Sequence, residues 1–220
     1  DSVKSIGDDA FYECSSLETV SIPDSVTTIG NYTFYDCSSL ETVSIPDSVT
    51  SIGYGAFKGC TSLENVSIPD SVTTIGNSAF KGINLQSVKL GSGLTSMHAD
   101  AFLNCGAITS LVLDTPLLGS TEDFVKTYFS ASQSKIEDVT IGDQVTSMGE
   151  DAFRDLSSLK SVSIGSDVKR IGTSAFSGCS SLTNITIPDS VTSISGAALN
   201  LCTSLETVSI PDSVTSIGVE

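Results

Sequence analysis

Six cysteines share one slot in the sequence, three residues after a recurring phenylalanine or leucine. They are Cys14, Cys37, Cys60, Cys105, Cys179 and Cys202. Neighbouring strands about 4.8 Å apart would allow disulfides by distance, but parallel side chains seldom have the required geometry. Zinc is disfavoured because the chain has no Cys-x-x-Cys pair and no paired histidines. Since Ile83 and Leu156 fill the same slot elsewhere, we predict free, buried thiols in hydrophobic positions.

A row of aspartates is the second group that could do chemistry. Asp24, Asp47 and Asp70 each follow a turn proline, and the pattern returns at Asp189 and Asp212. Stacked carboxylates could bind calcium, which takes several oxygen ligands. The alternative is that each aspartate caps its own turn and faces solvent, and no Asp-x-Asp-x-Asp-Gly loop is present. We favour the capping role and predict no metal site, keeping Asp24, Asp47 and Asp70 as weak calcium candidates.

Catalysis has little support in this sequence. The single histidine, His98, occupies the turn slot that Gly30, Gly53 and Gly76 fill elsewhere, so we interpret it as a tolerated turn residue. No nucleophile elbow, phosphate loop or metal-ligand spacing is present. We therefore predict that the chain is not an enzyme and needs no cofactor.

These residues recur because the whole chain is a repeat. Leucine returns at one constant interval at Leu17, Leu40 and Leu63, and again at Leu159, Leu182 and Leu205. A phenylalanine keeps the same period and predicts a continuous internal row of rings. Its members are Phe11, Phe34, Phe57, Phe80, Phe102, Phe124, Phe153 and Phe176, with Leu199 in the ninth place. The interval lies within the range of periods, between about 20 and 29, that is typical of leucine-rich solenoids.

Each repeat alternates as a half-buried strand does. Within residues 40–45, Val43 and Ile45 are predicted to point inward, with the polar residues between them outward. Pro46 then ends the strand. We expect Gly53 to supply a turn through positive or unrestricted φ, and Ala56-Phe57 to begin a single helical turn.

The middle of the chain departs from the repeat. One residue is missing between Phe80 and Leu85, and six are gained between Phe124 and Ile136. Thr121 resembles a helix N-terminus, and Phe124, Tyr128 and Phe129 follow at helical spacing. We predict one array of about nine coils over residues 1–220, with a helical insertion near residues 115–135.

The repeat string I-P-x-S-V-T-x-I-G-x-x-A-F-x-x-C-x-S-L-x-x-V-x-I runs through Ile22 to Ile45 and Ile187 to Ile210. It resembles the repeat of the BspA-like, or treponeme-type, leucine-rich repeat proteins. The resemblance implies a β-rich, right-handed leucine-rich repeat solenoid with a parallel β-sheet on its concave face. It also implies a cell-surface or secreted location and a role in adhesion, host-protein binding or aggregation between cells.

Charge limits the range of partners. The formal net charge is −16 and the sequence pI is about 4.1, which argues against nucleic acid and anionic membrane surfaces. No apolar run is long enough to insert into a membrane. The basic patch of Arg154, Lys160, Lys169 and Arg170 is predicted to pair with the acidic rows. Because the chain begins and stops at the same point within a repeat, we expect a fragment of a longer array.

The outward strand positions are small, polar and nearly uniform, so a binding site is expected where they change. Lys89, Val112 and Asp138 break the pattern, and Tyr128 and Phe129 of the insertion join them as candidate ligand contacts. We favour a module that binds another protein. The alternatives are a structural spacer without a ligand and, more remotely, a binder of a periodic glycan or crystal surface. Open strand edges at both ends also predict end-to-end self-association.

Overall fold

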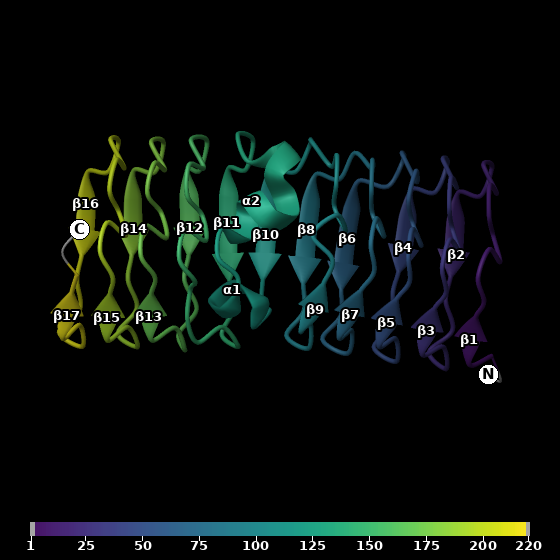
Figure 1. Ribbon diagram of the computed structural model, residues 1–220, viewed down its shortest axis with the longest axis horizontal. Helices are drawn as coiled ribbons and strands as arrows, with labels where there is room; N and C mark the ends of the chain where they lie inside the picture. Colours follow the sequence, from purple (N-terminus) through teal and green to yellow (C-terminus); the bar gives the residue numbers. More distant parts are fainter. Residues whose placement is uncertain (1–2, 219–220) are drawn as a thin grey trace. The chain divides into compact units, whose positions relative to one another are not determined.

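The computed structural model describes residues 3–218 of the chain. The chain forms two compact units, one comprising Asp1–Ile108 with Tyr128–Ala131 and the other Thr109–Thr127 with Ser132–Glu220. Within each unit the strands run side by side in two rows (Figure 1). The single array over residues 1–220 stays a prediction.

The first unit contains a row of longer strands and a row of two-residue strands. The longer strands are β2 (Thr19–Ser21), β4 (Thr42–Ser44), β6 (Asn65–Ile68) and β8 (Ser87–Leu90). The short strands are β1 (Ser5–Ile6), β3 (Thr28–Ile29), β5 (Ser51–Ile52), β7 (Thr74–Ile75) and β9 (Ser96–Met97). All the recorded pairings between these strands are parallel.

The second unit repeats this arrangement and carries the insertion. Its longer strands are β10 (Ser110–Leu113), β11 (Asp138–Ile141), β12 (Ser161–Ser163), β14 (Asn184–Thr186) and β16 (Thr207–Ser209). Its short strands are β13 (Arg170–Ile171), β15 (Ser193–Ile194) and β17 (Ser216–Ile217). Two short helices, α1 (Leu117–Ser120) and α2 (Phe124–Phe129), are followed by a 3₁₀ turn, η1 (Ser130–Ser132). Within this insertion, Tyr128–Ala131 belong to the first unit.

The strand register follows the sequence repeat. Thr19 lies opposite Thr42, which occupies the same slot of the next repeat. Asn65 lies opposite Ser87, so equivalent strand positions still pair although the repeat after Phe80 is one residue shorter. Across the insertion, Ser110 lies opposite Asp138, and the extra length loops out between these strands. The predicted solenoid of parallel strands is confirmed. Helix α2 lies inside residues 115–135, where a helical insertion was predicted. Helix α2 was expected, and α1 was not.

Stacked phenylalanine rings fill the core of the first unit. Ring centroids are 5.2 Å apart for Phe11–Phe34 and Phe34–Phe57, 5.3 Å for Phe57–Phe80 and 5.0 Å for Phe80–Phe102. The ring 5.0 Å from Phe102 belongs to Phe129, although the sequence spacing assigned the next place in the row to Phe124. Both rings are buried, because the longer coil brings two aromatic side chains of α2 inward.

The turn around Phe57 is not the single helical turn that was predicted. It consists of two successive turns, closed by hydrogen bonds from Lys58 N to Gly55 O (3.1 Å) and from Cys60 N to Phe57 O (3.2 Å). Gly55 and Gly59 have φ of 57° and 78°, which a right-handed helix cannot contain. The Phe57 N–H donates to Ala79 O of the following coil at 2.8 Å, so this segment bonds between coils.

The prediction that Gly53 is glycine because of its backbone conformation is also wrong. Its φ is not positive. A Cβ atom built at Gly53 would lie 2.7 Å from the carbonyl carbon of Gly30 and 2.8 Å from the nitrogen of Asn31. The same crowding recurs at Gly76 against Gly53 and at Gly172 against Gly149. These glycines are required because backbones of successive coils approach closely, and not because of the turn conformation.

Substituting alanine for Gly53 should therefore destabilise the fold. We expect Gly53→Ala to lower the free energy of unfolding by about 1–3 kcal/mol, since the added methyl group must push two coils apart. Gly7→Ala is the matched control, because Gly7 is in the same row and a Cβ there meets nothing within 4 Å. The control should leave the free energy unchanged or raise it by up to about 1 kcal/mol. Urea denaturation measures both, and equal effects would contradict the close-approach explanation.

Candidate functional site

The outward side chains of the longer strands in the first unit form a polar surface, which we call the first strand face. On β4, β6 and β8 it is made of Thr42, Ser44, Asn65, Ser67, Ser87 and Lys89. Alternation places these side chains outward while Val66, Ile68, Val88 and Leu90 are buried. The Ser87 Oγ donates to Asn65 Oδ1 at 2.6 Å, so neighbouring strands share hydrogen bonds across this surface.

A polar hollow lies at the end of these strands. It has a volume of about 300 Å³ and is lined by Ser44, Ser67, Asp47, Asp70 and Lys89, together with Val43, Ile45 and Pro69. The register explains the grouping, because Ser67 is opposite Lys89, and Asp47 and Asp70 lie on the turns that follow β4 and β6. The hollow thus combines one ammonium group, two carboxylates and two hydroxyls.

This hollow brings together residues from two predicted groups. Lys89 interrupts the uniform row of outward side chains, and Asp47 and Asp70 are the weak calcium candidates. A lysine in the same hollow competes with a metal cation for these carboxylates, and the Asp70 Oδ1 already accepts a hydrogen bond from the Ser92 N–H at 2.8 Å. Asp24 is exposed on its own turn. The arrangement fits a polar ligand that carries both hydrogen-bond donors for the aspartates and acceptors for the lysine.

A second hollow lies at the start of the same strands and is acidic. It has a volume of about 510 Å³ and is lined by Glu41, Thr42, Ser62, Glu64 and Asn65. The first strand face therefore changes along the strands, from carboxylates through hydroxyls and an amide to the lysine-containing hollow.

In the second unit, the corresponding outward positions include Val112 and Asp138. Asp138 is exposed on β11, and its Oδ1 accepts a short hydrogen bond from Ser161 Oγ. Beside it, Lys160 Nζ lies 2.8 Å from Glu137 Oε2, which confirms the predicted pairing with the acidic row for Lys160. Arg154 instead pairs with Asp151 and Asp155, which lie outside the predicted rows. Val112 on β10 is half-buried and gives this surface a small apolar element.

Tyr128 and Phe129 are not on the surface. Their side chains are 8% and 1% exposed, and Phe129 packs against Phe102 as described above. The helical spacing was correctly recognised, but the aromatic side chains fill the enlarged coil. A ligand on the outer surface would therefore not touch Phe129.

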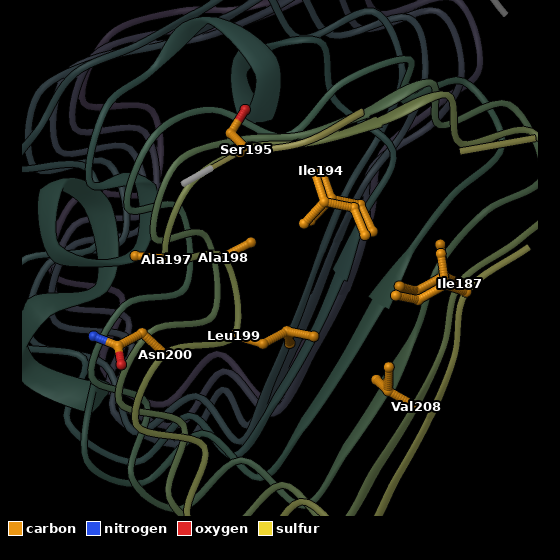
Figure 2. Close-up of a pocket in the computed structure, with 11 residues that line it drawn as sticks. Ile187, Ile194, Ser195, Ala197, Ala198, Leu199, Asn200 and Val208 are labelled. Atoms are coloured by element: carbon orange, nitrogen blue, oxygen red, sulfur yellow. The ribbon is translucent and has the colours of Figure 1, made fainter. Parts of the chain in front are cut away.

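An apolar hollow of about 280 Å³ borders the last described coil of the second unit. Figure 2 shows Ile187, Ile194, Leu199 and Val208 facing it. Leu199 stands in the phenylalanine slot, and Val208, Ile210 and Ile217 are exposed here. This surface fits the predicted end-to-end self-association, which stays a prediction.

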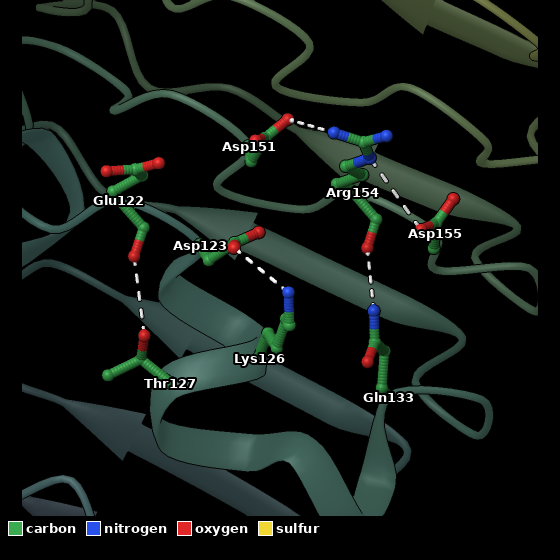
Figure 3. Close-up of polar contacts among 8 residues, drawn as sticks. All are labelled: Glu122, Asp123, Lys126, Thr127, Gln133, Asp151, Arg154 and Asp155. Atoms are coloured by element: carbon green, nitrogen blue, oxygen red, sulfur yellow. Dashed lines mark hydrogen bonds and ion pairs between the residues drawn. The ribbon is translucent and has the colours of Figure 1, made fainter.

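A charged cluster surrounds the start of α2 (Figure 3). Lys126 pairs with Asp123 at 3.2 Å, and Arg154 pairs with Asp151 at 3.2 Å and Asp155 at 3.7 Å. Within residues 3–218, the acidic groups close enough to share a metal ion are Glu122, Glu150 and Asp151. Arg154 already neutralises part of this charge, so the cluster is explained by local ion pairs.

His98 is explained by its turn. Its Nδ1 accepts a hydrogen bond from the Asp100 N–H at 3.1 Å, and its Nε2 lies 3.3 Å from Asn77 Nδ2. These contacts hold the ring on the surface of the first unit and agree with the interpretation of His98 as a turn residue.

Sequence reasoning missed a group of tyrosines in the first unit. They lie on the turns that follow the short strands β1, β3 and β5, and they are Tyr12, Tyr32, Tyr35 and Tyr54. The ring of Tyr12 contacts that of Tyr35, which contacts Tyr32, which in turn contacts Tyr54. Tyr12 and Tyr35 occupy the same slot of successive repeats, which was a signal available in the sequence. The other two occupy different slots of the repeat, so only the folded chain brings all four together.

The repeat can be compared with known proteins. Residues 1–116 and 123–220 match the model of the BspA-type leucine-rich repeat region, in six copies. The chain belongs to the BspA-type leucine-rich repeat family. No curated protein matches it. Within residues 3–218, the structure has no helix long and apolar enough to cross a membrane.

Several solved structures are similar to this BspA-type chain. A leucine-rich repeat protein of T. pallidum is 25% identical, with coverage of 82% of this chain and 72% of that one and a TM-score of 0.53. A leucine-rich cell surface protein of Faecalibacterium prausnitzii is 30% identical over 97% of this chain and 72% of that one, with a TM-score of 0.46. A Bacteroides ovatus leucine-rich repeat protein is 24% identical over 98% and 78%, with a TM-score of 0.46.

The cysteines of this BspA-type chain are all free, as predicted, and five of the six are buried. Each buried thiol lies against a backbone carbonyl of a neighbouring coil, for example Cys60 Sγ at 3.1 Å from Phe34 O and Cys105 Sγ at 3.0 Å from Phe80 O. Burial raises the pKa of Cys105 to about 11 and that of Cys179 to about 12. The slot therefore holds a small, uncharged group that also donates weakly.

Thiol labelling should separate Cys14 from the rest. Because the thiolate is the reactive species, a disulfide reagent at pH 8 should modify exposed Cys14 quickly and the five buried cysteines only as the chain unfolds. We expect one thiol per chain in the fast phase and six in denaturant. A Cys14→Ser variant is the control and should lose the fast phase. Fast modification of Cys60 or Cys105 in the folded chain would contradict the assigned burial.

Proposed function

We propose that this chain is a protein-binding repeat module, displayed on a cell surface or secreted, which binds its partner through the outward faces of its longer strands. The observation that supports this proposal is the hollow lined by Lys89, Asp47 and Asp70 at the end of a strand surface of small polar residues. The surface or secreted location extends the family resemblance. The assignment as a binding module agrees with membership in a leucine-rich repeat family.

The hollow suits a polar segment of another protein. Its lysine can bind a carboxylate or a carbonyl, its aspartates can bind amide or ammonium groups, and its serines can do either. Polar groups placed in a recess lose more water on binding than groups on a flat surface, so mismatched partners are rejected. In the second unit, Asp138 and Val112 are the outward residues that differ from the small polar pattern.

Surface substitutions test this proposal better than deletion of residues 115–135. That segment contains Leu118, Phe124 and Phe129, which are buried, so deleting it would damage the core. Lys89→Glu and Ser67→Tyr change the hollow and leave the core intact. Lys81→Glu is a matched control, because it makes the same charge change on a turn of the same unit.

Biotinylated chains can be incubated with human plasma, a complex mixture of extracellular proteins, and the retained proteins quantified by mass spectrometry. We expect proteins that the unmodified chain and Lys81→Glu retain equally to fall at least fivefold with Lys89→Glu and Ser67→Tyr, since central contacts of an interface contribute about 1–2 kcal/mol or more. Unchanged retention by Lys89→Glu and Ser67→Tyr would contradict the proposed position of the binding site. The alternative, a structural spacer, predicts that no retained protein saturates at micromolar concentration.

A further inference from the structure

Four tyrosine rings form one continuous surface in the first unit, which we call the tyrosine cluster. Ring centroids are 4.8 Å apart for Tyr12–Tyr35, 5.6 Å for Tyr35–Tyr32 and 4.9 Å for Tyr32–Tyr54. The first pair is stacked with planes 3° apart, and the other two pairs are edge-on. Tyr12 and Tyr54 are 44% and 41% exposed, so the cluster presents both ring faces and hydroxyl groups to solvent.

The fold does not require tyrosine at these positions. The slot of Tyr12 and Tyr35, directly after the core phenylalanine, holds lysine in the next coils, at Lys58 and Lys81. The slot of Tyr54 holds asparagine at Asn31 and Asn77. A group of exposed aromatic residues that the repeat can replace with polar ones is typical of a binding surface.

The neighbouring coil makes room for the cluster. A Cβ atom built at Gly55 would lie 2.9 Å from Cδ1 of Tyr32. Because Gly55 has no side chain, the Tyr32 ring can lie over the next coil and reach Tyr54. The four rings therefore span three successive turns.

The chain already places a cation on one of these rings. Lys58 Nζ lies 4.8 Å from the centroid of the Tyr35 ring and 3.3 Å from its hydroxyl oxygen, to which it donates. This is the distance at which an ammonium group is attracted by the face of an aromatic ring. The geometry shows that a positive charge fits against the cluster.

The surroundings are acidic. Asp9, Glu13 and Asp36 are close enough to act on the rings, and the whole chain carries a net charge of −16. Burial and then the Glu13 carboxylate raise the pKa of Tyr12, and burial, the hydrogen bond to Tyr54 and the Asp9 carboxylate are among the causes that raise the pKa of Tyr32. The carboxylates among these causes oppose a phenolate and favour a bound cation.

We propose that the tyrosine cluster docks an arginine-containing, basic segment of a partner protein. A guanidinium group is planar, so it can stack on an exposed tyrosine ring while its N–H groups donate to the carboxylates beside it. The cluster lies on turns and not on the outward strand positions, so this surface is additional to the proposed strand-face site. Failure of one proposal leaves the other intact.

The test uses the whole chain and a blocked peptide, Gly-Arg-Gly-Arg-Gly-Arg-Gly, with its citrulline counterpart as the uncharged control. The chain has no tryptophan, and four of its five tyrosines are in the cluster, so tyrosine fluorescence reports binding directly. We expect the arginine peptide to change the emission saturably and the citrulline peptide to leave it unchanged. Thermal unfolding confirms that each variant is folded.

Two variants locate the peptide. Tyr12→Leu/Tyr54→Leu should weaken binding at least tenfold, measured by calorimetry. Asp9→Asn/Glu13→Gln should weaken it about three- to tenfold and keeps all four rings. The matched control, Glu206→Gln/Asp212→Asn, removes the same number of exposed carboxylates from the second unit and should change the affinity less than twofold.

Three outcomes would overturn the proposal. Full affinity in the tyrosine variant would show that the rings are not the site. Equal losses in the two carboxylate variants would show only unspecific attraction to an acidic chain. Binding of a neutral oligosaccharide such as maltohexaose to the cluster, without binding of the arginine peptide, would identify the tyrosines as a sugar surface.

Discussion

The structure depends on parallel backbone hydrogen bonds that join each coil to the next. Within the first unit, Thr50 N donates to Thr27 O at 2.9 Å, Gly53 N to Ile29 O at 2.9 Å and Phe34 N to Ala56 O at 2.8 Å. No coil can bury its own apolar side chains, so stability requires neighbours in register. The sequence must then repeat wherever a side chain lies between coils: glycine where backbones approach, serine where a hydroxyl caps a carbonyl, and phenylalanine in the core.

This constraint explains why much of the fold could be predicted. The constant period of the leucines and phenylalanines and the alternation within residues 40–45 were sufficient to predict the repeated strand, the internal row of rings and the inward Val43 and Ile45. The errors occurred where one residue type satisfies two physical demands. Gly53 was assigned to a turn conformation because glycine permits positive φ, whereas the actual demand is space for the backbone of the adjacent coil. Ala56-Phe57 was predicted to begin a helical turn, but left-handed residues on either side, Gly55 and Gly59, prevent a helix.

The functional surfaces were harder to predict, because they join residues from different slots. Lys89 was recognisable as an exception in a uniform row, but its place beside Asp47 and Asp70 became visible only from the strand register. Tyr128 and Phe129 have helical spacing, which does not say which side of a helix is buried. The repeat that contains the insertion is longer than the others, and its two phenylalanine rings, Phe124 and Phe129, are both buried.

Stacking also separates residues that stabilise from residues that are free to differ. The hydroxyls of Ser48 and Ser71 donate to Val26 O and Val49 O at 2.6 and 2.7 Å, so changing them would leave carbonyl groups without these partners. The side chain after each core phenylalanine is not part of the ring row, and its type differs between coils. This slot holds Tyr35 in one coil and Lys58 in the next. The ammonium group of Lys58 lies over the ring of Tyr35 because equivalent slots of successive coils are neighbours. Regular stacking thus turns single differences in sequence into an extended surface, and it does so on the turns as well as on the strands.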